Sequence, residues 1–458
     1  MAEPSAFSTS AEDAITRTIK VESQGPSDLS DSEFLEYFEI ERTVREITKG
    51  GYKRIALQFP DELLHDSVPI YRSLKGRLPS DSGCELYVLA DTSYGSCCVD
   101  EVAAQHVDAN AMVHYGHACM SQTSRLPVIY VFGRKEIDAE DCATQLAACL
   151  NTAERQYDTV LLKSDVAYAH ASDDIVSRLQ STLPPSVHLV FSPLPLMALP
   201  AFQDSTTTSV TSDTPQHLTS PDAILYIGGE SLSLTNLLMT HSSAEVYTYD
   251  TTSKTTRLES GKTNRLLMRR YAMVQRARDA DVFGILVGTL GVASYLPLIS
   301  HLRTILKQAQ KKSYTISVGK LNPAKLANFM EIECFVMVAC PENSVVEAKE
   351  FLRPIVTPYE LEIALQSEPN WTGKYVLDFN EVLSAEKPEG PKEGAEPVDP
   401  DEPIFSLVTG RYRHAKRYGG GGGDIDEPPT LQGGSAVALR SQDNALSVLA
   451  DSASDKDV

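Results

Sequence analysis

Short apolar runs alternate with helical patterns along most of the chain. In one example, residues 86–90 are apolar and end in a polar loop with a glycine, residues 99–106 are helix formers, and residues 111–114 are apolar again. This order predicts a strand, a helix and a strand. Such a crossover makes the two strands parallel, so the loops after both strands open on one edge of the sheet.

The alternation repeats three times. The first strand of each repeat begins at Ile55, Val160 and Ile285, and a Ser/Thr-rich segment at 203–222, predicted to be a loop insertion, lengthens the second interval. Alternating strands and helices favour parallel sheets, so we expect three similar α/β domains in a pseudo-three-fold arrangement. Within the repeats, second strands are predicted at 86–90, 188–191 and 314–318, third strands at 111–114, 223–227 and 334–338, and fourth strands at 128–132, 245–249 and 355–357.

One long helical pattern precedes these units, and another lies between the second and the third. Apolar residues recur at helical spacing over 34–47, and Gly50 and Gly51 are expected to end that helix. A second helix is predicted at 258–279. It carries a run of positive charge, which is usually a solvated helix face, although an anionic ligand or an acidic partner is the alternative. The basic residues are Lys262, Arg265, Arg269, Arg270, Arg276 and Arg278.

The length of 458 residues exceeds what one hydrophobic core normally serves, and composition marks the ends of the folded part. Residues 1–33 are rich in Ser, Glu and Asp, and 384–458 in Glu, Pro, Gly and Lys, so both tails are expected to be largely disordered. Between them we expect domain 1 at 34–150, domain 2 at 151–257 with the insertion, and domain 3 at 258–383 with its leading helix.

Charge and cysteine usage narrow the class of protein. The net charge of −21 argues against general nucleic-acid binding. The sequence has neither a signal-peptide pattern nor a stretch of the roughly 18 apolar residues that a membrane span needs, so we expect a cytoplasmic protein without membrane contact. In a reducing compartment, eight unevenly spaced cysteines indicate metal binding or reactivity rather than a disulfide framework.

Three cysteines follow predicted strands. Cys97 and Cys119 follow the strands at 86–90 and 111–114, and Cys340 follows the strand at 334–338. A cysteine at a strand end is more often a packing residue, but two on one rim weaken that interpretation. Three pseudo-symmetric units would bring all three thiols to one centre, where thiolates can hold iron and sulfide. The sequence therefore predicts Cys97, Cys119 and Cys340 as ligands of a soft metal or an iron-sulfur cluster.

Zinc is the alternative metal, since His114 or His117 could complete a four-ligand site. These histidines are more readily interpreted as hydrogen-bonding groups. Cys98 could replace Cys97, although adjacent residues rarely both bind one metal. The remaining cysteines lie in or beside predicted helices and strands and are expected to be packing residues: Cys84, Cys142, Cys149 and Cys334.

Several segments carry a resemblance to a known family. They are DTSYGSCCVDE at 91–101, VHYGHAC at 113–119, GTLG at 288–291, VACP at 338–341 and LRPIVTPYE at 352–360, and they resemble the diphthamide-synthesis family. Two more segments, Phe38-Glu-Ile-Glu-Arg-Thr and Trp371-Thr-Gly-Lys-Tyr-Val-Leu-Asp-Phe, are similar to the second subunit of that family's eukaryotic enzyme. The similarity spans roughly residues 34–383.

The resemblance implies three α/β domains around a 4Fe-4S cluster. It implies transfer of the 3-amino-3-carboxypropyl group of S-adenosylmethionine to a histidine of translation elongation factor 2. It further implies that the chain forms a heterodimer with the catalytic subunit 1. A small electron-donor protein is a second implied partner. The C-x3-C-x2-C motif that is usual in radical S-adenosylmethionine enzymes is absent from this sequence, and the family also lacks it.

The middle unit departs from the family's catalytic type. That type has one cluster cysteine in each domain, whereas this sequence has Phe191-Ser192-Pro193 at the middle position and no cysteine between 160 and 250. Cys119 is the cysteine that could replace the missing one as the third cluster ligand. We therefore expect an accessory subunit that supports reduction of the partner's cluster, with S-adenosylmethionine used at the partner; no catalytic residue is assigned.

Two other classes remain open. A quinolinate-synthase-like dehydratase would also use three units and three cluster cysteines, but one of them should lie in the middle unit. A structural zinc scaffold would keep the fold and the thiols without redox chemistry.

Overall fold

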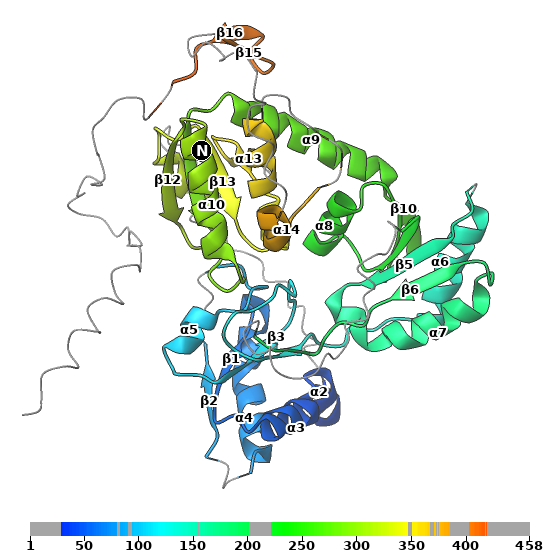
Figure 1. Cartoon of the computed structure of the whole chain (residues 1–458). Coiled ribbons are helices and arrows are strands. Elements are labelled where there is room, and N and C mark those ends of the chain that lie inside the picture. Colours follow the sequence, from blue (N-terminus) through cyan, green and yellow to red (C-terminus); the bar gives the residue numbers. More distant parts are fainter. Residues whose placement is uncertain are drawn as a thin grey trace, which may run out of the picture.

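The computed structural model forms an α/β protein whose three main sheets are mostly parallel, with helices packed against them (Figure 1). Residues 80–82, 90–93 and 201–220 belong to the parts left undescribed, so the predicted insertion lies almost entirely outside the described residues. The structure describes residues 29–79, 83–89, 94–153, 155–200, 221–346, 350–366, 371, 373, 375–384, 403–416 and 418.

The first sheet has the order β2-β1-β3-β4-β7. Its four main strands are parallel, and β7 pairs antiparallel with β4. Every residue of β3 and β4 is buried, which explains their uniformly apolar or aromatic character. The strands are β1 (Arg54–Gln58), β2 (Glu85–Val88), β3 (Ala111–Tyr115), β4 (Val128–Val131) and β7 (Met197–Ala198).

The second sheet has the order β10-β9-β8-β5-β6, again parallel except for one edge strand, β10. Its strands are β5 (Thr159–Ser164), β6 (His188–Phe191), β8 (Ala223–Ile227), β9 (Glu245–Asp250) and β10 (Thr255–Leu258). The third sheet, β12-β11-β13-β14, is entirely parallel. Its strands are β11 (Val282–Val287), β12 (Lys312–Ser317), β13 (Cys334–Val338) and β14 (Ile355–Val356).

All three sheets repeat one strand order. The first and third strands of each set lie side by side, the second strand lies outside the first, and the fourth lies outside the third. The predicted parallel α/β class is therefore confirmed, and the predicted strands are present with shifts of a few residues. The edge strands β7 and β10 were not predicted, because elements this short are defined by their pairing rather than by a local pattern.

The helices cover the sheets (Figure 1). Their apolar faces enter the cores, as when Leu298, Leu302 and Leu306 pack with strand residues of the third sheet. The helices are α2 (Asp31–Tyr37), α3 (Ile40–Gly50), η1 (Asp61–Asp66), α4 (Ser67–Arg77), α5 (Glu101–Gln105), α6 (Ala139–Thr152), η3 (Val166–Ala171), α7 (Ser172–Thr182), α8 (Leu232–Thr240), α9 (Ser260–Arg278), α10 (Tyr295–Gln308), α11 (Pro323–Ala327), α12 (Pro341–Ser344), α13 (Pro358–Leu365) and α14 (Phe379–Ser384).

The prediction of one helix over 34–47 is wrong. Glu39 adopts a left-handed conformation (φ 48°), which separates α2 from α3. Helix α2 begins at Asp31, within the predicted N-terminal tail, and the Ser30 and Glu33 side chains form a capping box there. Residues 1–28 lie outside the described part of the chain.

The basic helix α9 is not simply a solvated face. Arg270 is buried and forms a bidentate ion pair with Glu360 of α13, which Tyr375 also contacts. Lys262 forms an ion pair with Glu230, next to the second sheet. Helix α9 therefore uses part of its charge to hold neighbouring elements together.

A short hairpin of the predicted C-terminal tail contacts the third unit. Its strands are β15 (Ile404–Ser406) and β16 (Arg411–Arg413). Ser406 donates a 2.6 Å hydrogen bond to Asp279, and Arg413 forms an ion pair with Asp281. Residues 385–402 and 419–458 lie outside the described residues. Within the described residues, no helix is long and apolar enough to cross a membrane.

Candidate metal centre

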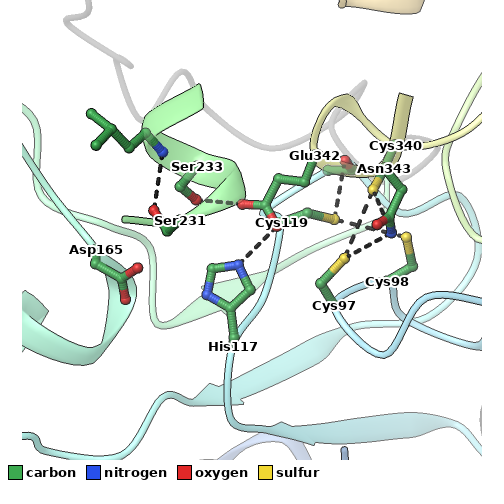
Figure 2. Close-up of polar contacts among 12 residues, drawn as sticks. Cys97, Cys98, His117, Cys119, Asp165, Ser231, Ser233, Cys340, Glu342 and Asn343 are labelled. Atoms are coloured by element: carbon green, nitrogen blue, oxygen red, sulfur yellow. Dashed lines mark hydrogen bonds and ion pairs between the residues drawn. The ribbon is translucent and has the colours of Figure 1, made fainter. Parts of the chain in front are cut away.

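Four thiols meet between the first and third units. The sulfur atoms of Cys97, Cys98, Cys119 and Cys340 all lie within 4.8 Å of one another (Figure 2). Cys97 and Cys340 have their sulfur atoms 3.8 Å apart, and Cys98 and Cys119 have theirs 4.0 Å apart. The structure therefore brings together the three cysteines that the sequence predicts as ligands, and adds Cys98.

The loops of the first sheet position three of these thiols. Gln58 ends β1 and is buried; its amide donates to the Cys98 carbonyl at 2.8 Å, and its own carbonyl accepts from the Asp100 N–H at 2.9 Å. The Cys119 N–H donates to the Cys97 carbonyl at 3.1 Å, which joins the loop after β2 directly to the loop after β3. The thiols are thus held at the carboxyl edge of a parallel sheet.

Cys340 follows β13 and precedes Pro341, the first residue of α12. Its carbonyl accepts the N–H groups of Asn343 and Ser344, both at 3.0 Å. The loop after β11 packs closely against the first unit. A Cβ at Gly291 of this loop would lie only 2.0 Å from the Val99 carbonyl oxygen. Glycine at 291 therefore permits a close approach between the third unit and the segment that follows Cys97 and Cys98.

Contacts among the four thiols shift the pKa of Cys119 and the pKa values of Cys97 and Cys98 in opposite directions. Hydrogen bonds from the thiols of Cys340, Cys97 and Cys98 hold the pKa of Cys119 well below its ordinary value. The same contact with Cys119 raises the pKa values of Cys97 and Cys98. The thiols would lose their protons when a metal binds, because the thiolate is the form that binds metal.

Glu342 joins the three units beside the thiols. Its side chain is buried and accepts from Ser233 of α8 at 2.5 Å, while its second oxygen lies 2.8 Å from His117 Nε2 (Figure 2). Burial would lower the pKa of His117, but the hydrogen bond and the charge of Glu342 outweigh it and raise that pKa. His117 therefore acts as a hydrogen-bonding group, as the sequence favours.

His114 lies in β3 and is fully buried. Neither ring nitrogen has a hydrogen-bond partner among the described residues, and burial lowers its pKa to about 4, so the ring is neutral. Its ring packs near that of Tyr130. Neither histidine belongs to the thiol group, so the alternative in which a histidine completes the ligand set gains no support.

The donor set suits a soft metal. Thiolates are the preferred ligands of iron-sulfur clusters and also of structural zinc. The other four cysteines lie apart from this group: Cys84, Cys142 and Cys334 are buried in hydrophobic cores, and Cys149 is half-buried on α6. That Cys97, Cys119 and Cys340 bind iron remains a prediction.

Sequence reasoning missed Cys98 as a fourth member of the group. The Cys98 N–H donates to the Gly95 carbonyl at 3.1 Å, and the turn made there turns both adjacent thiols toward Cys119 and Cys340. The pair of cysteines itself was the available signal. Glu342 and Asn343 were missed too, because a helix as short as α12 gives little local pattern.

A cavity of about 400 Å³ lies beside this centre, between the first and second units. Ser96 and His117 line it on the side of the thiols, and Asp165, Tyr168 and Ser231 line the opposite side. No cysteine is among the described residues that line it. A molecule in this cavity would therefore lie next to the thiol loops without facing the sulfur atoms.

Comparisons with known proteins show which proteins this chain resembles. Residues 59–376 match a family model described as "Putative diphthamide synthesis protein". The chain is 41% identical to 2-(3-amino-3-carboxypropyl)histidine synthase subunit 2 of Xenopus laevis, over 97% of this chain and 91% of the relative. It is 43% identical to the protein of that name from Schizosaccharomyces pombe, over 88% and 77%. The crystal structure of Dph2 from Pyrococcus horikoshii with a 4Fe-4S cluster matches with a TM-score of 0.54 and 20% identity, over 74% of this chain and 93% of that one.

Proposed function

Because the chain belongs to the family of diphthamide synthesis proteins, we propose that it is the iron-sulfur subunit of the synthase for the first step of diphthamide biosynthesis. In that step the 3-amino-3-carboxypropyl group of S-adenosylmethionine is transferred to a histidine of translation elongation factor 2. The proposed role of this chain is to support reduction of the cluster in the catalytic subunit. The observation that carries the proposal is the group of four thiols, three of them buried and Cys119 half-buried.

Cys97, Cys119 and Cys340 would hold a 4Fe-4S cluster, and Cys98 is near enough to supply a fourth thiolate. The Dph2 protein of Pyrococcus horikoshii, which shares this fold, crystallised with such a cluster. A bound cluster would supply one-electron transfer. The residues of this chain would hold it in a largely water-excluded site, since Cys340 is fully buried and Cys97 nearly so.

Three features favour electron transfer over cleavage of S-adenosylmethionine at this subunit. The middle unit contributes no cysteine between 160 and 250, unlike the family's catalytic type. Four thiolates can occupy all four irons of a cubane, whereas three leave one iron open. The neighbouring cavity is lined by Ser96 and His117 rather than by thiols. S-adenosylmethionine would therefore be used at the partner subunit.

The proposal includes the wider organisation of the chain. The three sheets would belong to domains at 34–150, 151–257 and 258–383, arranged with pseudo-three-fold symmetry around the thiols. The partners would be the catalytic subunit 1, elongation factor 2 and a small electron-donor protein, in the cytoplasm. The repeated strand order of the three sheets supports this division.

Sulfur spacing favours a second candidate, a structural zinc scaffold. A tetrahedral site with Zn–S bonds of about 2.3 Å separates its sulfurs by about 3.8 Å. The separations of 3.8 Å and 4.0 Å are close to that value. A cubane, which carries sulfide between its irons, would require the four thiols to move apart.

The division of labour between subunits tests the proposed function. The chain alone, supplied with a reductant and S-adenosylmethionine, is expected not to form the 3-amino-3-carboxypropyl fragment, whereas the mixture with the catalytic subunit should form it. In the mixture, Cys340→Ser should slow turnover mainly with a physiological electron donor, because a strong chemical reductant can reach the partner's cluster directly. Product is measured by the modification of elongation factor 2.

Two results would contradict this assignment. One is full activity of the chain by itself. The other is an intact heterodimer in which Cys340→Ser abolishes turnover equally with both reductants, because the chemistry would then take place at this subunit's cluster. Cys149→Ser, which changes a half-buried thiol outside the group, is the matched control and should leave both rates unchanged.

A further inference from the structure

The side chain of Asn343 points into the thiol group (Figure 2). Its amide nitrogen lies 3.3 Å from Cys97 Sγ and 3.5 Å from Cys340 Sγ. A thiolate sulfur accepts hydrogen bonds, and one amide nitrogen offers two N–H donors. We propose that Asn343 is a positioning residue that raises the reduction potential of the bound cluster by donating hydrogen bonds to these two sulfurs.

The chain makes room for this amide with a glycine. A Cβ at Gly95 would lie 2.2 Å from Asn343 Nδ2 and 3.2 Å from its Cγ. Gly95 belongs to the same turn that presents Cys97 and Cys98, since its carbonyl accepts the Cys98 N–H. The absence of a side chain at 95 therefore lets the amide reach the sulfurs.

The backbone of Asn343 is fixed as well. Its N–H donates to the carbonyl of Cys340 at 3.0 Å, so the residue is tied to one of the thiols that its side chain contacts. The preceding residue, Glu342, is held by Ser233 and His117. Helix α12 thus directs one side chain to the junction of the units and the next to the sulfurs, which pre-organises the amide.

The inference rests on the proposed function, because it concerns the iron-sulfur cluster. Uptake of one electron from a reductant makes the cluster and its thiolates more negative. Hydrogen bonds to the sulfurs stabilise the more negative state, and they act strongly where water is excluded. Asn343 would therefore make this subunit a better electron acceptor.

Potentiometric titration of the purified holoprotein tests the role of Asn343. In Asn343→Leu, a side chain of similar size lacks the donor, and the equilibrium constant for one-electron reduction by dithionite should fall about tenfold, which is about 59 mV in the midpoint. Gly95→Ala retains Asn343 but pushes its side-chain amide away from the sulfurs, so it should shift the midpoint potential in the same direction. Asn380→Leu changes an exposed asparagine and is the control. The reduced cluster is followed by its paramagnetic resonance signal.

Iron and sulfide in the wild-type protein are measured first, because their absence would overturn the proposed function and this inference with it. With iron present, an unchanged midpoint in Asn343→Leu and Gly95→Ala would overturn the role of Asn343 alone. If Asn343→Leu does not retain iron, the Gly95→Ala variant alone is used, and an unchanged midpoint potential in that variant would overturn the role of Asn343. An equal shift in Asn380→Leu would also contradict the proposal.

Discussion

Replacing Cys340 by serine is expected to reduce the iron retained by the anaerobically purified protein severalfold. Cys340 is fully buried, and it is the cysteine of the group that the third unit supplies. A hydroxyl is a harder and weaker ligand for iron than a thiolate. Cys97→Ser and Cys119→Ser should lower the iron content as well, because each removes a predicted ligand. Iron per chain is measured by elemental analysis, alongside the visible absorption of the cluster.

The controls separate ligation from folding. Cys84→Ser and Cys149→Ser change cysteines that lie outside the thiol group and should retain wild-type iron. Equal loss of iron in all five variants would show that stability, not ligation, was being measured. Cys98→Ser adds information, because its iron content shows whether the fourth thiol is used when the other three are present.

Replacing Glu360 by alanine is expected to destabilise the protein by about 3–5 kcal/mol, the usual cost of leaving one partner of a buried ion pair alone. Glu360 is fully buried, and its carboxylate accepts from Arg270 and, at 2.7 Å, from Tyr375. The Thr357 N–H donates to the same carboxylate at 2.9 Å. Its loss would leave the Arg270 guanidinium buried without a counter-charge. The free energy of unfolding is measured by denaturant titration.

A second glutamate on the same helix is the matched control. Glu362 pairs with His301, and both side chains are 22% exposed. Glu362→Ala should therefore cost no more than about 1 kcal/mol. The double variant Arg270→Met/Glu360→Leu, which removes both charges, should be less destabilised than Glu360→Ala. An equal loss of unfolding free energy in Glu360→Ala and Glu362→Ala would contradict the prediction that the buried Arg270–Glu360 pair matters more for stability than the half-buried His301–Glu362 pair.

The strands of the repeats were predictable because their residue types reflect their environment. Strands such as β3 and β13 are buried along their whole length and consist of short apolar runs. The break between α2 and α3 was not predictable, because a left-handed glutamate has no local signal. The edge strands β7 and β10 depend on their pairing with β4 and β9.

The candidate site was predictable as far as each thiol follows a strand. Cys97, Cys119 and Cys340 could be placed by the rule that parallel strands open their loops on one edge. The surroundings of the thiols depend on contacts across the chain: Glu342 meets His117, which is 225 residues away, and Asn343 meets Cys97, which is 246 residues away. Only the packing of the three units brings such groups together.

The metal content of the wild-type protein tests the central claim most directly. The chain is purified anaerobically, and iron, acid-labile sulfide and zinc are measured per chain on the same sample. We predict a brown protein with about four irons and about four sulfides, as a cubane held by the gathered thiols requires. One zinc per chain without sulfide would contradict the iron-sulfur assignment and would establish the zinc scaffold instead.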